Sequence, residues 1–256
     1  MFNMITLKKT IKKIGSFILQ FVIGKKKLDK IRHKKYLKKE SRLIREVGPI
    51  ALQKFYDIAK EESCEYWLFW GSLLGAYRDK GFIKHDDDID IGMYDTDISV
   101  SFVEKMKNNG FNVIWAIVDK DFIGGYHLAC TYQGVKFDIY SFHRDVDSKV
   151  NTVFCPLPYK DTIVRENAVK TDVMHINMES WDHLDEISFE GVKTYIPCNA
   201  DSVLRSLYGN DYMIPIVDKK AQDDTASNKV VEDHDMHYAC MMSYEVFKML
   251  KKTGAI

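Results

Sequence analysis

Residues 71–92, GSLLGAYRDKGFIKHDDDIDIG, contain four closely spaced aspartates near their end. Asp86, Asp87 and Asp88 are consecutive, and Asp90 follows after a single isoleucine. Side chains of a strand alternate between its faces, so Asp88 and Asp90 are expected on one face, about 7 Å apart along the backbone. Two such carboxylates repel each other unless a cation lies between them, and hard oxygen ligands suit Mg²⁺ or Mn²⁺. The spacing therefore predicts a metal site on a strand.

A further acidic candidate lies in a second apolar segment, VKFDIYSF, where Asp138 stands between Phe137 and Ile139. A carboxylate on a neighbouring strand could complete a two-metal site for in-line phosphoryl transfer. A solvated acidic loop would also explain the acidic run, but it fits less well where aspartate alternates with isoleucine. An EF-hand is rejected because Ile91 and Asp97 occupy the positions that require Gly and Glu.

Gly71 and Ser72 follow a short aromatic segment, EYWLFW, and precede a segment that can start a helix. Exposed N–H groups at a helix start favour an anion, glycine leaves room for a phosphate, and the serine hydroxyl can donate a hydrogen bond. The pair predicts a phosphate-binding turn, although Gly-Ser is also common in ordinary turns. The sequence has no Walker A loop, GxGxxG or GxSxG, so P-loop, Rossmann and serine-hydrolase functions have no support.

The elements that must position these residues follow from hydrophobic periodicity. Helices are expected over residues 27–62, 73–78, 98–108 and 202–207. Strands are expected over residues 65–70, 88–91, 111–118, 126–132 and 135–142. A turn at Gln133-Gly134 should join the last two strands into a hairpin. The pattern predicts a mixed α/β (α+β) fold, in which helices flank a mixed sheet.

Several local features refine these elements. Gly48-Pro49 lies inside the first helix and should kink or split it. Ser72 should lie near the N-cap of the second helix, and Gly209 should take special backbone angles in a turn. The periodicity weakens after residue 142, so loops are expected to about residue 186. The end of the chain, residues 238–252, is amphipathic.

Length and composition describe an ordinary globular protein. The chain has 256 residues, of which 46% are hydrophobic and 29% charged, and this excludes disorder, collagen and coiled coil as the main class. We expect one domain over residues 41–256, behind an arm over residues 1–40. The five cysteines include no CxxC pair, so free thiols in a reducing cytoplasm are expected.

Charge is divided between a basic arm and an acidic body. Residues 1–40 carry 13 Lys and Arg against two acidic residues, net +11, and the rest carries 24 basic against 35 acidic residues, net −11. Neither part has the basic face of a nucleic-acid-binding domain, so no nucleic-acid partner is expected.

The arm also contains an apolar run, IGSFILQFVIG, at residues 14–24. It is too short to span a bilayer, and three lysines follow it in place of a signal-peptide cleavage site. We expect an interfacial helix that holds the protein peripherally on the anionic inner face of the cell membrane. The alternative is a helix packed on the body or on a partner subunit.

The order of Gly71-Ser72, Asp88-Ile89-Asp90 and Asp138 is similar to the pattern of the nucleotidyltransferase superfamily. Residues 71–93 resemble more specifically the signature of the LicD family, which includes bacterial phosphocholine transferases and is related to the fukutin-type ribitol-phosphate transferases. VKFDIYSF and the later segments FEGVKTYIP and LYGNDYMIP also resemble this family. Lys84-His85 depart from it, since members usually carry Pro-Trp there.

The resemblance implies a nucleotidyltransferase-like fold and transfer of a phospho-alcohol, such as phosphocholine, from a CDP-alcohol donor to a sugar hydroxyl of a cell-surface glycan acceptor, with release of CMP. Asp88 and Asp90 would hold Mg²⁺ or Mn²⁺ on the diphosphate. Asp138 would bind a second metal or take the acceptor proton. Gly71 and Ser72 would hold phosphate oxygens.

For several other residues the sequence leaves two interpretations open. Arg78 would add a charge-assisted contact to the substrate, or is a surface arginine. Asp87 and its neighbour Asp86 support the substrate or metal site, or belong to an acidic loop. His234 and His237 are weak zinc candidates and are more typical of a capping or surface pair. Aromatic residues could stack on a base or sugar, or lie in the core; these are Trp67, Trp70, Tyr77, Trp115 and Tyr140.

Two rival functions remain open on sequence alone. A nucleotidyltransferase that attacks the α-phosphate of an NTP and releases pyrophosphate would use the same carboxylates. A degenerate, non-catalytic scaffold is disfavoured because all three metal-site carboxylates are present.

Overall fold

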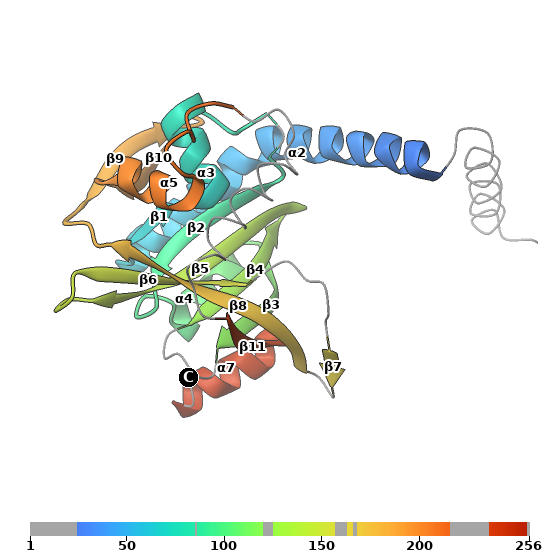
Figure 1. The fold of residues 1–256 in the computed structure, drawn as a ribbon. Helices are drawn as coiled ribbons and strands as arrows, with labels where there is room; N and C mark the ends of the chain where they lie inside the picture. The colour runs from blue at the N-terminus through green and yellow to red at the C-terminus, as the bar shows by residue number, and fades with distance from the viewer. Residues whose placement is uncertain are drawn as a thin grey trace, which may run out of the picture.

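The computed structural model describes residues 25–84, 86–119, 125–156, 163–165, 168–215 and 236–254. Helices and a mixed sheet together confirm the predicted mixed α/β class (Figure 1). The α-helices are α2 (Lys25–Glu62), α3 (Trp70–Leu74), α4 (Val100–Asn108), α5 (Ala200–Tyr208) and α7 (Tyr244–Thr253), and the π-helix η1 (Gly75–Asp79) directly follows α3. The strands are β1 (Tyr66–Leu68), β2 (Asp88–Tyr94), β3 (Phe111–Asp119), β4 (Tyr126–Tyr132), β5 (Val135–Asp145), β6 (Val150–Pro156), β7 (Ile163–Arg165), β8 (Ala168–Glu179), β9 (Leu184–Phe189), β10 (Val192–Pro197) and β11 (Met236–Met242).

The main sheet has the strand order β1-β2-β5-β4-β3-β11-β8-β6, with β7 beside β8. Strands β2 and β5 are parallel, and the other neighbours in this order are antiparallel. The end of β5 also pairs with β6, so the strands from β5 round to β6 form a closed ring. The first part of β5 therefore lies between β2 and β4, in the interior of the sheet.

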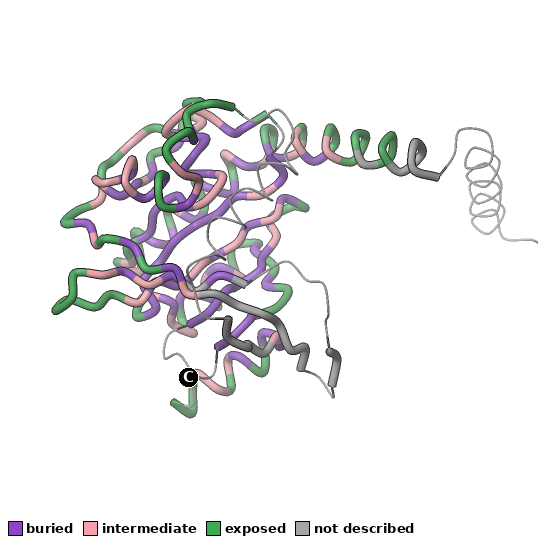
Figure 2. The backbone as a smooth tube through the Cα atoms, in the orientation of Figure 1, coloured by how far each residue is buried: buried purple, intermediate pink, exposed green. Residues whose placement is uncertain are grey.

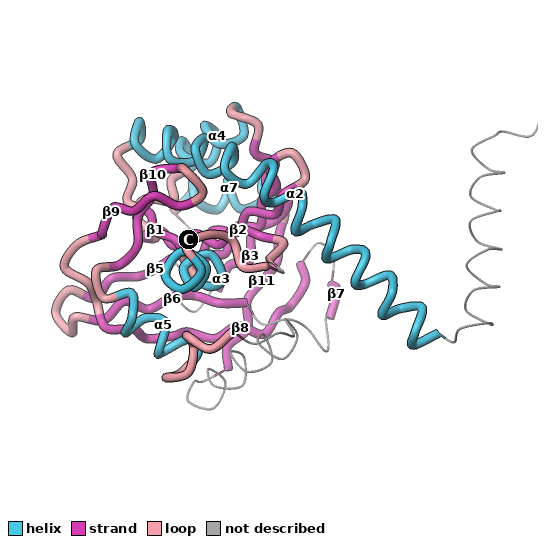
Figure 3. Tube along the Cα trace, turned by 90° about the horizontal axis from the view of Figure 1, so that it is seen from above, coloured by secondary structure: helices cyan, strands magenta, loops and turns pink. Residues whose placement is uncertain are grey.

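Helix α2 joins an exposed segment to the core of the protein. Its first half extends away from the sheet (Figures 1 and 3), and Figure 2 shows buried residues only where the helix reaches the body. Its second half packs against α4, β5 and β10. Phe55 lies at the centre of this contact, with its ring 4.9–6.2 Å from the rings of Tyr66, Phe102, Phe111 and Phe137.

Local chemistry explains several element boundaries. The Ser99 hydroxyl accepts a hydrogen bond from Phe102 N–H and caps α4. Gln133 and Gly134 both have positive φ, 47° and 91°, as the tight turn of the predicted β4–β5 hairpin requires. The predicted glycine angle at Gly209 is also confirmed, with φ 84° where α5 ends.

Some sequence-based expectations were wrong. The first helix is not split at Pro49, because α2 continues from residue 25 to 62; a kink at Pro49 stays a prediction. The region from 142 to 186 is not mainly loop, because β6 and β8 pair with each other over seven positions. The amphipathic end of the chain, residues 238–252, contains two elements, since β11 ends at Met242 and Ser243 caps helix α7. Partners distant in sequence hold β6, β8 and β11 in the sheet, so local periodicity underestimates them.

Some expectations lie outside the described residues. They concern the apolar run at residues 14–24, His85, His234 and the side chains of His237 and Cys240. The other four cysteines are free thiols, as expected. Among the described helices, none combines the length and the apolar character needed to cross a bilayer.

Candidate active site

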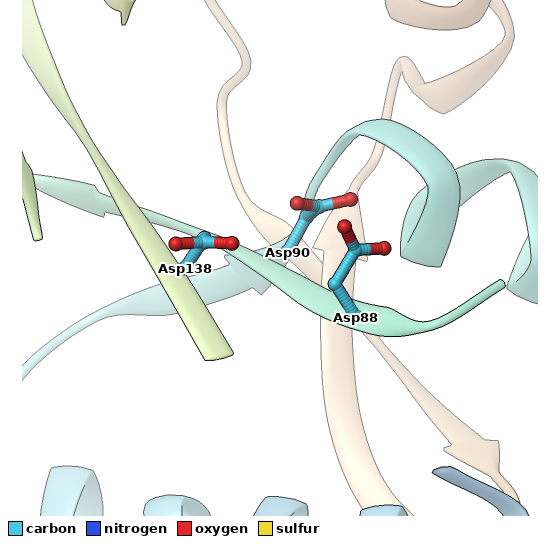
Figure 4. A group of neighbouring side chains, drawn as sticks. All are labelled: Asp88, Asp90 and Asp138. Atoms are coloured by element: carbon cyan, nitrogen blue, oxygen red, sulfur yellow. The ribbon is translucent and has the colours of Figure 1, made fainter. Parts of the chain in front are cut away.

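The parallel pairing of β2 with β5 brings three aspartates together. Asp90 and Asp138 are register partners on these strands, and Asp88 shares the strand face of Asp90 because side chains alternate. One carboxylate oxygen from each of the three lies within 4.8 Å of the others. Figure 4 shows Asp88 and Asp90 rising from one strand and Asp138 from its neighbour. The residues that the sequence singled out for a metal site therefore lie side by side.

The donor set suits a hard divalent cation. All three ligands are carboxylates; Asp90 is 7% exposed, and Asp88 and Asp138 are half-buried. Ligands on opposite sides of an octahedral Mg²⁺ lie about 4.2 Å apart, since each bond is about 2.1 Å. The observed spacing therefore needs only small side-chain movements to hold an ion. Without a cation, the three charges repel one another in a partly desolvated position.

Gly71 borders the carboxylates from α3. Its N–H donates a hydrogen bond of 3.2 Å to Asp90 Oδ2, and a Cβ placed on it would lie 3.5 Å from the Asp86 carboxylate and 3.6 Å from Asp90 Oδ2. Helix α3 has five residues and continues directly into a π-helix, Gly75–Asp79. Contact of Gly71 with a phosphate stays a prediction.

Ser72 supports Asp90 from within the fold. It lies inside α3, which begins at Trp70, so it is not the N-cap that the sequence indicated. Its side chain is buried, and its hydroxyl accepts a hydrogen bond of 3.0 Å from Asp90 N–H. This bond fixes the start of α3 against β2. A phosphate contact from Ser72 stays a prediction, and the structure shows a positioning role.

We expect Gly71→Ala to separate folding from activity. The added methyl meets its neighbours at 3.5–3.6 Å, which is ordinary van der Waals contact, and alanine favours a helix over glycine by about 0.5–1 kcal/mol. The melting temperature should therefore hold or rise. The methyl takes space directly beside the carboxylates, so transfer should fall at least about tenfold, equivalent to about 1.4 kcal/mol. Unchanged transfer in the folded variant would show that the donor does not approach Gly71.

The guanidinium of Arg78 is engaged by groups of the protein itself. Its guanidinium forms two hydrogen bonds with the Asp79 carboxylate, of 2.8 and 3.0 Å, and a third with the Tyr212 carbonyl at 3.2 Å. Its side chain is 6% exposed, so it is not the surface arginine that was the alternative. These contacts tie the π-helix η1 to the segment after α5. A direct contact with substrate stays a prediction.

Asp87 is paired with a lysine that the sequence reading passed over. Lys136 Nζ lies 2.7 Å from Asp87 Oδ2, and Lys136 is the register partner of Asp88. Burial opposes the charged form of Lys136, but the hydrogen bond and charge of Asp87 raise its pKa above the ordinary value. A permanent cation therefore lies next to the acidic cluster. Asp86 is buried beside Gly71.

The aromatic candidates divide between core and site. Trp67 is buried against Tyr94, Phe142 and Trp181, whereas Trp115 is 40% exposed on β3. Trp70 lies near Tyr208, the last residue of α5. Tyr77 lies near Tyr212. Tyr140 follows Asp138 on the same strand face. Burial raises the pKa of Tyr140 well above its ordinary value, and the nearby Asp90 and Asp138 charges add to this.

His127 is a residue at the site that the sequence reading missed. Its Nε2 lies 3.3 Å from Asp138 Oδ1. The hairpin register contained the signal, because a two-residue turn at 133–134 pairs residue 129 with 138 and residue 127 with 140. His127 is thereby placed diagonally across from Asp138 on the same face.

A comparison with family models supports the resemblance over residues 63–199, and the segment LYGNDYMIP at 207–215 lies beyond the match. A family model described as LicD/FKTN/FKRP, nucleotidyltransferase domain, matches residues 63–199. The chain is similar to an uncharacterized protein of Rickettsia typhi (strain ATCC VR-144 / Wilmington), at 28% identity over 105 residues, which is 40% of this chain and 31% of that protein. It is also similar to the ribitol-5-phosphate transferase FKTN of Mus musculus, at 23% identity over 163 residues, 61% of this chain and 31% of that protein. The matches thus span about a third of each relative's length.

Proposed function

The chain belongs to the LicD/FKTN/FKRP family of nucleotidyltransferase-domain proteins, and on this premise we propose that it is a transferase that moves a phospho-alcohol from a CDP-alcohol to a sugar hydroxyl of a cell-surface glycan. The observation that carries the proposal is the convergence of Asp88, Asp90 and Asp138 within the matched region. The similarity to a ribitol-5-phosphate transferase supports the phospho-alcohol class.

The reaction needs charge stabilisation on the donor and removal of a proton from the acceptor. Asp88, Asp90 and Asp138 would hold Mg²⁺ or Mn²⁺, and such an ion supplies Lewis-acid stabilisation of the phosphoryl oxygens. The N–H and hydroxyl bonds from Gly71 and Ser72 hold Asp90 in place. As the alternative to binding the ion, Asp138 would accept the sugar hydroxyl proton, if the acceptor comes within about 3 Å. Lys136, beside Asp87 and Asp88, would offset the negative charge of the diphosphate.

Product analysis tests this function directly. The full-length protein is incubated with Mg²⁺, a panel of CDP-alcohols and the host's own glycan, and the products are analysed by mass. Release of CMP together with a glycan gain of one alcohol phosphate supports the proposal. Pyrophosphate released from an NTP, with nucleotide on the acceptor, would instead identify a nucleotidyltransferase. The absence of turnover with every donor would favour a scaffold.

We further propose that residues 1–40 attach the protein to an anionic membrane surface. Residues 25–39 carry nine Lys and Arg against Asp29, and most of the described side chains in this part of α2 are exposed. The helix there stands clear of the sheet (Figure 3). A basic helix of this kind is attracted to anionic lipids, where each Lys or Arg contributes about 1 kcal/mol.

Deleting residues 1–26 should weaken binding to anionic vesicles, while the seven Lys and Arg of residues 27–39 keep part of it, and should preserve transfer to a soluble acceptor analogue. The deletion removes six lysines and the apolar run, whereas the site begins only at Gly71. Binding of the intact chain should weaken with salt, because screening shortens to about 8 Å at physiological ionic strength. Co-sedimentation with anionic and with neutral vesicles measures the effect. An intact chain that ignores anionic vesicles at low salt, together with a truncated chain that aggregates, would show that the arm is structural.

A further inference from the structure

His127 contributes a polar side chain to the sheet face that carries the three aspartates. It lies on β4 as the register partner of Tyr140 on β5 and of Ile117 on β3. Asp138 is two residues before Tyr140, so the two side chains are diagonal neighbours across the β4–β5 pair. His127 Nε2 approaches Asp138 Oδ1 to 3.3 Å.

The environment of His127 is unusual for a polar residue. Its side chain is more than nine-tenths buried, and neither ring nitrogen has a hydrogen-bond partner among the described residues. At 3.3 Å, the approach to Asp138 is a close polar contact without the length and alignment of a hydrogen bond. A buried group in this state destabilises the fold relative to an apolar side chain of similar size. Packing alone therefore does not account for a histidine here.

The ring of His127 is held firmly in this position. The Tyr140 ring lies 4.7 Å from it, at an interplanar angle of 41°. Next to both residues, Ser141 Oγ accepts a 2.6 Å hydrogen bond from Tyr126 N–H, which ties β4 to β5 where β4 begins. The imidazole thus has a fixed location relative to Asp138. Groups that contact a ligating side chain in this way commonly set its orientation.

We propose that His127 is a positioning residue that holds the Asp138 carboxylate in the orientation required for divalent-cation binding and transfer. The inference rests on the proposed function, because it takes Asp138 as a member of the cation site. His127 acts through Asp138 and does not itself touch substrate.

Metal affinity of the substrate-free, full-length protein tests this role apart from turnover. Mn²⁺ binding is measured by electron paramagnetic resonance for the wild type, His127→Phe and His127→Gln, and transfer is measured in parallel. His127→Phe should weaken the Mn²⁺ Kd about 10- to 100-fold and lower kcat, while the melting temperature holds or rises. His127→Gln can place an amide N–H near the Nε2 position, so its Kd should return to within about threefold of the wild type. His127→Asn, which is too short to reach, should resemble His127→Phe and replaces it if the phenylalanine variant does not fold.

His143→Phe is a matched control on β5. His143 also contacts an aspartate, Asp95, at 2.7 Å, but that pair lies outside the three-aspartate group, and its substitution should leave the Mn²⁺ Kd unchanged. Wild-type affinity in both His127→Phe and His127→Asn would overturn the positioning role and leave the proposed function standing. Equal loss of affinity and of melting temperature in all His127 variants would show a structural role and overturn it as well. Failure of the wild type to bind Mn²⁺ would overturn the cation site itself, and the inference with it.

Discussion

Asp90→Asn should reduce transfer by at least about a thousandfold and leave the fold intact. A metal ion in such a site stabilises transition-state charge by several kcal/mol, and each 1.36 kcal/mol changes the rate tenfold. Asparagine has the same shape and keeps one oxygen that can accept from Gly71 N–H, the bond that Asp90 makes now. Asp88→Asn should give a similar loss. The comparison is made on kcat/KM, with circular dichroism to verify the fold.

Stability should change in the opposite direction to activity. Three carboxylates within 4.8 Å repel one another when no cation is bound, so removing one charge should hold or raise the melting temperature of the metal-free protein. Asp185→Asn is the control, because Asp185 is an exposed aspartate on β9, in a different sheet. It should keep full activity. Near-wild-type turnover in both site variants would refute the assignment of these carboxylates.

Phe55→Ala should lower the free energy of unfolding by about 3–5 kcal/mol, which is the usual cost of truncating a buried phenylalanine. Phe55 is fully buried and its ring is surrounded by four aromatic rings, from β1, α4, β3 and β5. The truncation would therefore leave a cavity where α2 contacts the sheet and α4, and these contacts would be lost. Urea denaturation followed by circular dichroism measures the change.

Ile50→Ala provides the comparison on the same helix. Ile50 is 48% exposed, so its truncation should change the free energy of unfolding by no more than about 0.5 kcal/mol. If both variants lose similar stability, the cost comes from the helix and not from the aromatic cluster. A loss below about 1 kcal/mol in Phe55→Ala would show that the surrounding rings close the cavity.

Sequence periodicity predicted best the elements whose partners are close along the chain. The β4–β5 hairpin was predicted because a two-residue Gln-Gly turn sets its register. Strand β2 was predicted from Asp-Ile alternation, although it runs on to Tyr94. Strands β6 and β8 were missed, since their paired residues are 17 to 29 positions apart and β8 needs β11 from the end of the chain as its other neighbour. Stability of such strands comes from contacts that no local window contains.

The candidate site divides in the same way. Strand alternation alone predicts that Asp88 and Asp90 share a face. Because Asp138 also lies in an apolar strand, the sequence could predict that it belongs to the same site. The environments of Ser72 and Arg78 were not predictable, because the groups that bind them, Asp90 N–H and the Tyr212 carbonyl, are 18 and 134 residues away in sequence. His127 was missed although the hairpin register placed it near Asp138. A single histidine in an apolar strand gives no signal until its neighbour across the sheet is identified.

The pairing of β2 with β5 has a consequence for the lifetime of the protein. Asp138 lies between β2 and β4 in the interior of the main sheet, with Asp90 as its register partner, and backbone amides in such a position exchange with solvent only when a large part of the fold opens. A cation held there binds the folded chain and has no equivalent site in the unfolded one, so it adds to global stability. At a hundredfold excess over its Kd this amounts to about 2.7 kcal/mol. Scarcity of the cation would therefore shorten the life of the protein against proteolysis as well as slow its turnover.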